Sequence, residues 1–369
     1  MNLVKLNQHT KIEREEMART KNETLESMSL ATELPSEYRQ TDKLLNRLDS
    51  YSTLKHRTTQ WLDWAESGGI DLAKRDNKKL SKSLNDCGSY LIFRHFKKSQ
   101  TSHLIGSCSC KEHLLCAFCA SRRGVKNSVA YKEKVDELQS KNSNLKLYFV
   151  TYTVKNGENL HERFTHLKNS MQALIQRRRD FIKRPTVRHC EFAKFQGGVM
   201  SYEFKRGSGE NKWHPHIHML VLVDLRQFIN HNELKREWLE ITGDSHVVNI
   251  QAVASKAAYL EVFAYALKFS EMEHSDRWHA FKTLKGKRLI VSFGELRGVE
   301  LPESLDDDNL PVDDEWYDEL YRWERGRGYS SARLLLNSSD AKSIKTINEG
   351  LAIPRLERLQ NVIKCDFGA

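Results

Sequence analysis

The feature that most restricts the fold of this chain is a regular alternation of strand and helix patterns between residues 145 and 271. Strand patterns, in which apolar residues recur at every second position, cover 145–154, 197–206, 215–224 and 246–253. Helical patterns, in which they recur at every third or fourth position, cover 160–182, 231–241 and 256–271. The second and third strands are joined by GSGENKW, a turn-rich link that suits a hairpin. The order of elements is therefore β-α-β-β-α-β-α.

This order predicts the split β-α-β arrangement of ferredoxin-like folds. The fold class is then α+β, with an antiparallel sheet that carries helices on one face. Composition divides the chain into four parts: a polar leader, helical or partly disordered, at 1–83; a cysteine-rich module at 84–140; the domain of alternating strands and helices at 141–296; and an acidic linker with a helical tail at 297–369.

The overall composition is that of a globular protein. Hydrophobic residues make up 39% of the 369 positions and charged residues 29%. No run approaches the roughly 18 apolar residues that identify a membrane-spanning helix. The N-terminal segment also lacks the apolar stretch of a secretory signal. We therefore expect a cytoplasmic protein without membrane contact.

The charge is distributed unevenly along the chain. The net charge is +10, although residues 303–319 hold nine acidic residues and no Lys or Arg. The remainder of the chain is thus more basic than the total suggests. A chain that is this basic outside residues 303–319 indicates a polyanionic partner such as nucleic acid. Lys and Arg side chains that neutralise phosphates release condensed counterions, and this release favours binding.

Two histidines in the strand PHIHMLVLVD form a candidate metal site. Successive side chains of a strand alternate between faces, so His216 and His218 lie on the same face and can chelate one cation. Glu203 in the preceding strand of the hairpin offers a carboxylate, which suits Mg²⁺ or Mn²⁺. His214 is a competing third ligand, but Pro215 should turn the chain there. The alternative interpretation is a pair of ordinary half-buried histidines.

A tyrosine in the last helical pattern is a candidate nucleophile. Glu261, Tyr265 and Lys268 are spaced by four and three positions, so they share one face of a helix. A tyrosinate can attack a phosphodiester if a divalent ion stabilises the charge on the phosphate. Tyr259 lies six positions before Tyr265 and should point elsewhere. By itself the segment also fits an amphipathic helix with an aromatic core residue, and the upstream histidines favour the catalytic interpretation.

Four of the seven cysteines lie within twelve positions, and a cytoplasmic chain has little use for disulfides. We predict a structural Zn²⁺ site, because the C-x-x-C pair lets two thiolates reach one tetrahedral ion. Its candidate ligands are Cys108, Cys110, Cys116 and Cys119, with His113 or His103 as alternatives that could complete the set. The other cysteines, Cys87, Cys190 and Cys365, are interpreted as small buried hydrophobic residues. Arg122 and Arg123 follow the cluster directly and are predicted to contact DNA phosphates.

Together these motifs resemble a known family, the replication initiators of small rolling-circle plasmids within the HUH endonuclease superfamily. The resemblance lies in YFVTYTVKN (148–156), MSYEFKRGSGENKWHPHIHML (200–220) and LEVFAYALKF (260–269), which occur in the family's order and spacing. It extends upstream to LNDCGSYLIF (84–93) and CKEHLLCAFCASRRG (110–124), so it covers about residues 84–295.

The resemblance implies a role for each candidate residue. His216 and His218 would bind the catalytic metal, Tyr265 would be the single nucleophile, and Glu261 would serve termination by hydrolysis. Lys268 matches a trailing lysine of the motif, and residues 141–296 would form the HUH endonuclease domain. The implied activity is a nick in one strand of the plasmid origin through a 5′-phosphotyrosine. The implied partners are origin DNA, duplex and single-stranded, with a host helicase and DNA polymerase.

Two other classes of function compete with this interpretation. Single-strand transposases and conjugative relaxases share the chemistry, but they often carry two tyrosines on one helical face, where this chain has Glu261 and Tyr265. A non-catalytic, zinc-containing DNA-binding regulator would explain the charge and the cysteines. It would leave the histidine pair and the tyrosine without a role.

Overall fold

The computed structural model describes residues 38–185, 189–207, 212–253 and 257–337. Residues 1–37 of the predicted leader, residues 338–369 of the predicted tail and Cys365 lie outside the described residues. The chain divides into two units. The larger unit contains Ser50–Cys87 and Ser109–Leu305, and the smaller contains Ser36–Asp49, Gly88–Cys108 and the chain from Asp306. No described helix is long and apolar enough to cross a membrane.

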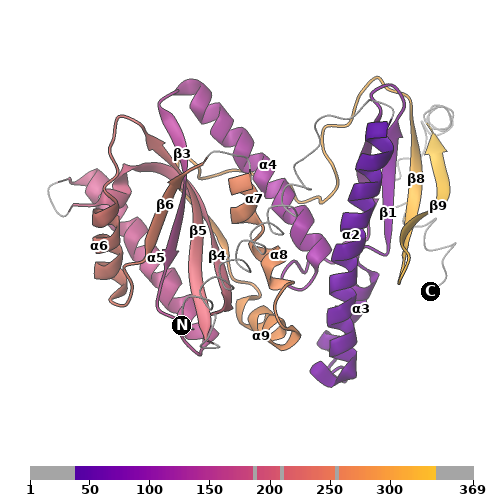
Figure 1. The fold of residues 1–369 in the computed structure, drawn as a ribbon, viewed down its shortest axis with the longest axis horizontal. Coiled ribbons are helices and arrows are strands. Elements are labelled where there is room, and N and C mark those ends of the chain that lie inside the picture. The colour runs from indigo at the N-terminus through magenta and orange to yellow at the C-terminus, as the bar shows by residue number, and fades with distance from the viewer. Residues whose placement is uncertain (1–37, 186–188, 208–211, 254–256, 338–369) are drawn as a thin grey trace, which may run out of the picture. The chain divides into compact units, whose positions relative to one another are not determined.

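A five-stranded antiparallel sheet, in the order β6-β3-β5-β4-β7, forms the centre of the larger unit (Figure 1). Its strands are β3 (Leu145–Thr153), β4 (Phe195–Arg206), β5 (Trp213–Asp224), β6 (Val248–Ala252) and β7 (Ile290–Gly294). The main helices and helical turns are α2 (Tyr38–Trp64) with a π-helical turn (Ala65–Gly69), α3 (Arg75–Asp86), α4 (Ala117–Lys141), α5 (Leu160–Lys183), a 3₁₀ turn (Glu191–Lys194), α6 (His231–Thr242), α7 (Ala257–Phe263), α8 (Tyr265–Phe269) and α9 (His274–Leu284). The α+β class, the antiparallel sheet and the β-α-β-β-α-β-α order are confirmed.

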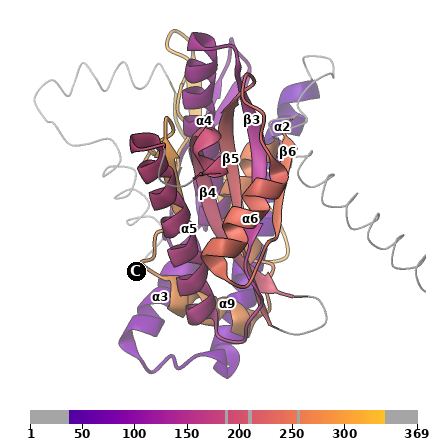
Figure 2. The same ribbon diagram turned by 90° about the vertical axis from the view of Figure 1, so that its left-hand side faces the viewer.

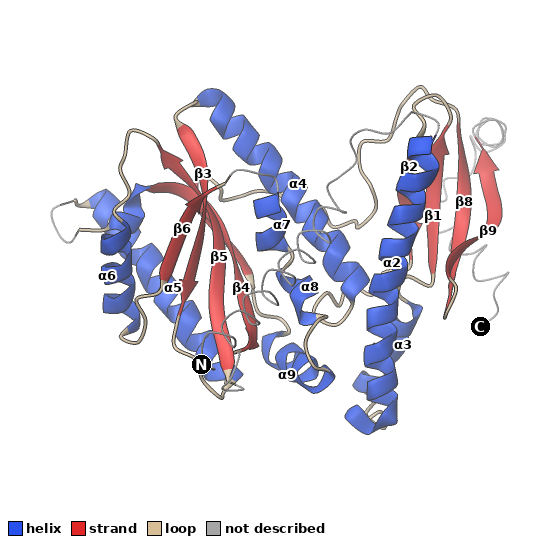
Figure 3. Cartoon of the chain, in the orientation of Figure 1, coloured by secondary structure: helices blue, strands red, loops and turns tan. Residues whose placement is uncertain are grey.

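Helices cover both faces of this sheet, whereas the sequence led us to expect them on one (Figure 3). On one face, Phe164 of α5 contacts the rings of Tyr202 and Phe204, and Trp238 of α6 contacts Tyr152. Figure 2 shows α5 and α6 together on this face. The opposite face packs against α4 and α7 in one core cluster. The reason is that the central strand β5 is buried on both sides, so both faces need a cover.

The smaller unit contains a four-stranded antiparallel sheet assembled from two distant parts of the chain. Its order is β2-β1-β8-β9, and its strands are β1 (Tyr90–Phe96), β2 (Thr101–Ser107), β8 (Trp316–Glu324) and β9 (Gly328–Asn337). The hairpin β1–β2 belongs to this sheet, whereas α4 belongs to the larger unit. Residues 84–140 are therefore not a separate module, and the predicted helical tail is a β-hairpin within the described residues.

Several carboxylates of the predicted acidic linker have structural partners in this unit. Asp307 accepts hydrogen bonds from the Arg47 guanidinium (2.9 Å) and the Leu104 amide (2.8 Å). Asp314 accepts from the backbone amides at the β1–β2 turn. Asp318 pairs with Arg94 in two parallel hydrogen bonds of 2.7 and 2.8 Å. The acidic segment thus ends in strand β8, and carboxylates of the loop before that strand are hydrogen-bonded to the β1–β2 hairpin.

Replacing Arg94 by Ala should destabilise the protein by about 3–5 kcal/mol, because it leaves the carboxylate of Asp318, 1% exposed, without its cation. Urea unfolding followed by circular dichroism measures the effect. Lys97→Ala is the matched control, because its ion pair with Glu315 is exposed and should contribute less than about 1 kcal/mol. Equal shifts of the unfolding midpoint in the two variants would contradict the prediction.

Candidate active site

Glu203, His216 and His218 meet on the face of the sheet that α4 and α7 cover. The β4–β5 register places Glu203 opposite His216 and Ser201 opposite His218. The Nε2 atom of His216 lies 3.0 Å from Glu203 Oε2, and that of His218 lies 3.4 Å from the same oxygen. One ligand atom from each residue lies within 4.8 Å of the others. The three residues chosen from the sequence thus form one cluster that could hold a cation.

The ring of His216 has an acceptor beside each of its nitrogens. Burial lowers the pKa of this imidazole, although Glu203 opposes the shift, so the ring is neutral near pH 7. Its Nδ1 faces the carbonyl oxygen of His214 at 3.4 Å, and a carbonyl can only accept a hydrogen bond. Its Nε2 lies 3.0 Å from the Glu203 carboxylate, which also only accepts, so one of these two contacts uses the single proton of the neutral ring. Neutral imidazoles and a carboxylate are common ligands of divalent metals, so the grouped residues fit such an ion.

Neighbouring side chains orient this cluster. Thr151 of β3 lies directly opposite His218, and its hydroxyl is 3.1 Å from Nδ1 of that ring. Because Nδ1 faces this hydroxyl, Nε2 of the same ring is directed toward Glu203. In many metal sites a residue that does not itself bind the metal orients the ring of a histidine ligand in this way. The ring of His214, by contrast, places Nδ1 2.7 Å from the Asn156 side-chain oxygen. The geometry favours Glu203 over His214 as the third ligand.

Lys268 connects this cluster to Glu261. Its ammonium lies 2.9 and 3.0 Å from the two carboxylate oxygens of Glu203 and 2.5 Å from Glu261. Burial alone would lower the pKa of Lys268, but the two carboxylates outweigh burial and raise it. Burial would likewise raise the pKa of Glu203, and its contacts with the histidines and Lys268 reverse this shift and lower it. The site therefore holds an ammonium in contact with the carboxylate groups of both Glu203 and Glu261.

Tyr265 is not hydrogen-bonded to this cluster among the described residues. The predicted continuous helix is broken at Ala264, so α7 carries Glu261, and α8 begins at Tyr265. The tyrosine is 5% exposed and packs edge-on against the ring of His113. Burial raises the pKa of its hydroxyl, and the charge of Arg123 opposes this shift. Glu261, Tyr265 and Lys268 therefore do not lie on one continuous helix as predicted. Of the three, Glu261 and Lys268 are in contact.

The two arginines predicted to contact DNA differ in exposure. Arg122 is buried, and its guanidinium donates to the Leu305 carbonyl and to the Tyr51 hydroxyl. It therefore stabilises the fold, and the prediction of a phosphate contact is corrected. Arg123 is partly exposed, donates to the Pro302 carbonyl, and lies close enough to Tyr265 to affect its pKa. It stays a candidate phosphate contact.

Gly124 of α4 lets the segment that carries Tyr265 approach closely. A Cβ atom at this position would lie 2.9 Å from the carbonyl oxygen of Phe263, two residues before the tyrosine. Gly124→Ala should therefore displace the α7–α8 junction and slow any reaction of Tyr265 by about 100-fold, the usual effect of a misplacement near 1 Å. Assays of the DNA cleavage that the resemblance implies measure this effect, with Val129→Ala, an exposed change on α4, as control. Unchanged cleavage by Gly124→Ala would contradict the prediction.

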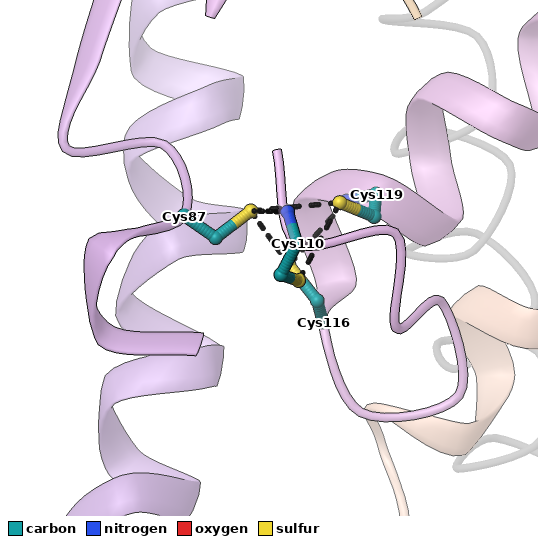
Figure 4. A group of neighbouring side chains, drawn as sticks. All are labelled: Cys87, Cys110, Cys116 and Cys119. Atoms are coloured by element: carbon teal, nitrogen blue, oxygen red, sulfur yellow. Dashed lines mark hydrogen bonds between the residues drawn. The ribbon is translucent and has the colours of Figure 1, made fainter. Parts of the chain in front are cut away.

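The cysteine cluster differs from the predicted set in one member. The thiols of Cys110, Cys116 and Cys119 meet, and the fourth thiol is that of Cys87 (Figure 4). Cys108 is not part of this group, and Cys87 is not an isolated buried residue. The reason lies in the hairpin β1–β2, whose two ends are joined by a hydrogen bond from the Gly88 amide to the Cys108 carbonyl. Residues just before and just after a hairpin necessarily lie close together.

The other predicted alternatives have different partners. His103 contacts Thr101 and the ring of Phe96, and His113 contacts Tyr265. Cys190 is buried, as expected for a small hydrophobic residue. Cys87 was missed because it is separated from the other three by a complete hairpin. The sequence signal for it was its position in LNDCGSYLIF (84–93), shortly before a run of apolar residues.

A family model for a replication protein matches residues 102–324, more than half of the chain. Three curated relatives are all called "Protein rep". The protein of Streptococcus pneumoniae serotype 2 (strain D39 / NCTC 7466) is 27% identical over 51% of this chain and 60% of its own length. The protein of Staphylococcus aureus is 24% identical over 46% of this chain and 71% of its own length. The protein of Lactiplantibacillus plantarum is 26% identical over 65% of this chain and 81% of its own length.

No solved structure matches the chain. The matched region contains Glu203, His216, His218, Glu261 and Tyr265, together with three of the four clustered cysteines. The chain spans less than two thirds of the length of the streptococcal relative. The chain belongs to the replication protein family, and the resemblance to plasmid rolling-circle initiators is confirmed at the level of the family.

Proposed function

We propose that the chain initiates plasmid rolling-circle replication by nicking one strand of the double-strand origin through a covalent bond to Tyr265. The observation that carries this proposal is the convergence of Glu203, His216, His218, Glu261 and Lys268 on one face of the sheet, beside the helix that begins at Tyr265. A merely structural histidine pair does not require an ammonium and two carboxylates around it.

In the proposed nick the Tyr265 oxygen forms a bond to the scissile phosphorus, and the bond from phosphorus to the 3′ oxygen breaks. The phenolic proton passes to water, and the leaving oxygen takes one from water, so the product is a 5′-phosphotyrosine and a free 3′-hydroxyl. The hydroxyl would serve a host polymerase as primer after a helicase has opened the duplex. The bond to tyrosine retains the energy needed for rejoining.

The surrounding residues would bind and orient the phosphate. Glu203, His216 and His218 would hold Mg²⁺ or Mn²⁺, which supplies charge stabilisation at the phosphate when bound. Lys268 adds a positive charge beside them, and Arg123 offers a second one near the tyrosine. Because α8 is short and begins at Tyr265 itself, the ring can turn out of its contact with His113 without breaking a long helix.

The proposal is tested with labelled single-stranded oligonucleotides tiled across the replicon that encodes the chain. The full chain is incubated with each in Mn²⁺ or in EDTA, and a denaturation-resistant protein–DNA adduct is sought. We expect an adduct with one site of the replicon, in Mn²⁺ only. Binding of this DNA without cleavage would contradict the proposal and favour the zinc-containing regulator.

Glu261→Ala should spare the first nick and impair termination, because this carboxylate would activate water or the incoming 3′-hydroxyl when the reaction runs a second time. We expect near-normal adduct formation and at least about a tenfold decrease in release of the adduct. The measurement compares the appearance and decay of the adduct on an origin oligonucleotide in a single turnover. Equal loss of both steps would remove the termination role.

A further inference from the structure

We propose that Cys87, Cys110, Cys116 and Cys119 together bind one zinc ion, and that this ion fixes the loop Cys110–Cys116 against Tyr265. The site joins three parts of the chain: the end of α3, the segment after β2, and the start of α4. Figure 4 shows the four side chains converging from these parts.

The spacing of the sulfur atoms fits a single ion. The Sγ–Sγ distances are 3.4 Å from Cys87 to Cys116, 3.5 Å from Cys87 to Cys119 and 3.7 Å from Cys110 to Cys119. The edge of a tetrahedron of thiolates around Zn²⁺ is about 3.8 Å, given Zn–S bonds of about 2.3 Å. All four sulfurs lie within 4.8 Å of one another, which leaves no room for a cluster of several metal ions.

Backbone amides point at these sulfurs as they do in metal–thiolate sites. The Cys110 amide donates to Cys87 Sγ at 3.3 Å, and the Cys119 amide donates to Cys116 Sγ at 3.5 Å. The second of these bonds caps the N-terminus of α4, where negative charge is stabilised by the helix dipole. Amide donors of this kind stabilise sulfur as thiolate, the form that binds a metal.

A buried arginine next to the cluster indicates that the site carries negative charge. Arg277 of α9 is 1% exposed, and two of its guanidinium nitrogens, Nε and Nη1, have no hydrogen-bond partner. The third guanidinium nitrogen, Nη2, donates a hydrogen bond to the carbonyl oxygen of Leu115, which lies in the loop Cys110–Cys116.

A buried cation is tolerated where an anion offsets it, and four thiolates around Zn²⁺ carry a net negative charge. Lys55, 3% exposed, supplies a second cation, because its ammonium donates to the carbonyls of Cys87 and Asn85. Four neutral thiols would leave Arg277 without an acidic hydrogen-bond partner among the residues that the structure describes. The two buried cations therefore match an anionic metal–thiolate centre.

The loop that this centre closes forms the surroundings of Tyr265. His113, between Cys110 and Cys116, contacts the ring of Tyr265 edge-on. Glu112 of the same loop pairs with Lys285, at the end of α9. The ion thus holds a short loop without regular structure in one conformation beside the proposed nucleophile. This second part of the inference rests on the proposed function, whereas the metal site does not.

The metal site is tested on the full chain by elemental analysis and by Co²⁺ substitution, in wild type, Cys87→Ser and Cys108→Ser. We expect about one thiolate-bound zinc per chain in wild type and Cys108→Ser, and its loss in Cys87→Ser. Thiolate-to-Co²⁺ charge-transfer absorption separates this site from the histidine cluster. Loss of that absorption in Cys108→Ser and its retention in Cys87→Ser, or iron with its thiolate colour in place of zinc, would overturn the proposal.

Wild-type protein provides a second test if Cys87→Ser does not fold. We expect a zinc chelator to increase alkylation of Cys87 and Cys110, while buried Cys190 stays protected. Protection of Cys87 that does not respond to the chelator would overturn the metal site.

For the second part of the inference, the positioning of Tyr265, adduct formation in Mn²⁺ should be slow in Cys87→Ser and normal in Cys108→Ser. Equal rates would overturn the positioning of Tyr265, and failure of wild type to form any adduct would contradict the nicking function but not the zinc site.

Discussion

Tyr265→Phe should abolish the covalent protein–DNA adduct, with a decrease of about 10³-fold or more, because it removes the only oxygen that can form the bond to phosphorus. Binding of single-stranded DNA should be unchanged, because the substitution removes one buried hydroxyl that has no hydrogen bond to the metal cluster among the described residues. The measurement is the fraction of labelled oligonucleotide that stays on the protein after denaturation.

Tyr259→Phe is the matched control. This tyrosine belongs to the same pair of short helices, but it packs in the core cluster with Tyr131 and Val262. We expect full adduct formation in this variant. If Tyr265→Phe still forms the adduct, or if Tyr259→Phe fails to form it, Tyr265 is not the nucleophile.

Glu203→Gln should raise the Mn²⁺ concentration needed for nicking by about 100-fold or more, because it removes the carboxylate that contacts both histidines and Lys268. The amide has the same size, so the hairpin should keep its register. Adduct formation as a function of Mn²⁺ concentration measures the shift.

His214→Ala distinguishes the two candidates for the third ligand. The ring of His214 contacts Asn156 and lies outside the metal-competent group, so this variant should keep the Mn²⁺ dependence of wild type. A large shift for His214→Ala, with none for Glu203→Gln, would identify His214 as the ligand and contradict the assignment of Glu203.

Features that depend on neighbours close in the sequence could be predicted from it. His216 and His218 share a face because alternation along a strand is local, and Glu203 meets them because the consecutive strands β4 and β5 pair antiparallel. The order of strands and helices in residues 145–271 follows from the same short-range patterns. These patterns were sufficient to locate the candidate metal cluster.

Features that depend on distant contacts could not be predicted in this way. Cys87 reaches the other cysteines only because a hairpin closes between them, and Arg122 is buried because Leu305 and Tyr51 receive its guanidinium. The break at Ala264 changes which side chains meet, although the helical pattern continues across it. The segment WYDELYRWE fits a helix as well as a strand, and its pairing with β1 decides the outcome.

The smaller sheet has a consequence for the order in which the protein can fold during synthesis. Its strand β1 emerges from the ribosome early, but the partner β8 follows more than two hundred residues later, after the complete domain that carries the candidate active site. Until then β1 and β2 form a two-stranded hairpin, which is only marginally stable in water and exposes an unpaired apolar edge. A ribosome that stops before residue 316 therefore releases a chain with an open strand edge, so truncation in this region should cause aggregation even when every candidate active-site residue is present.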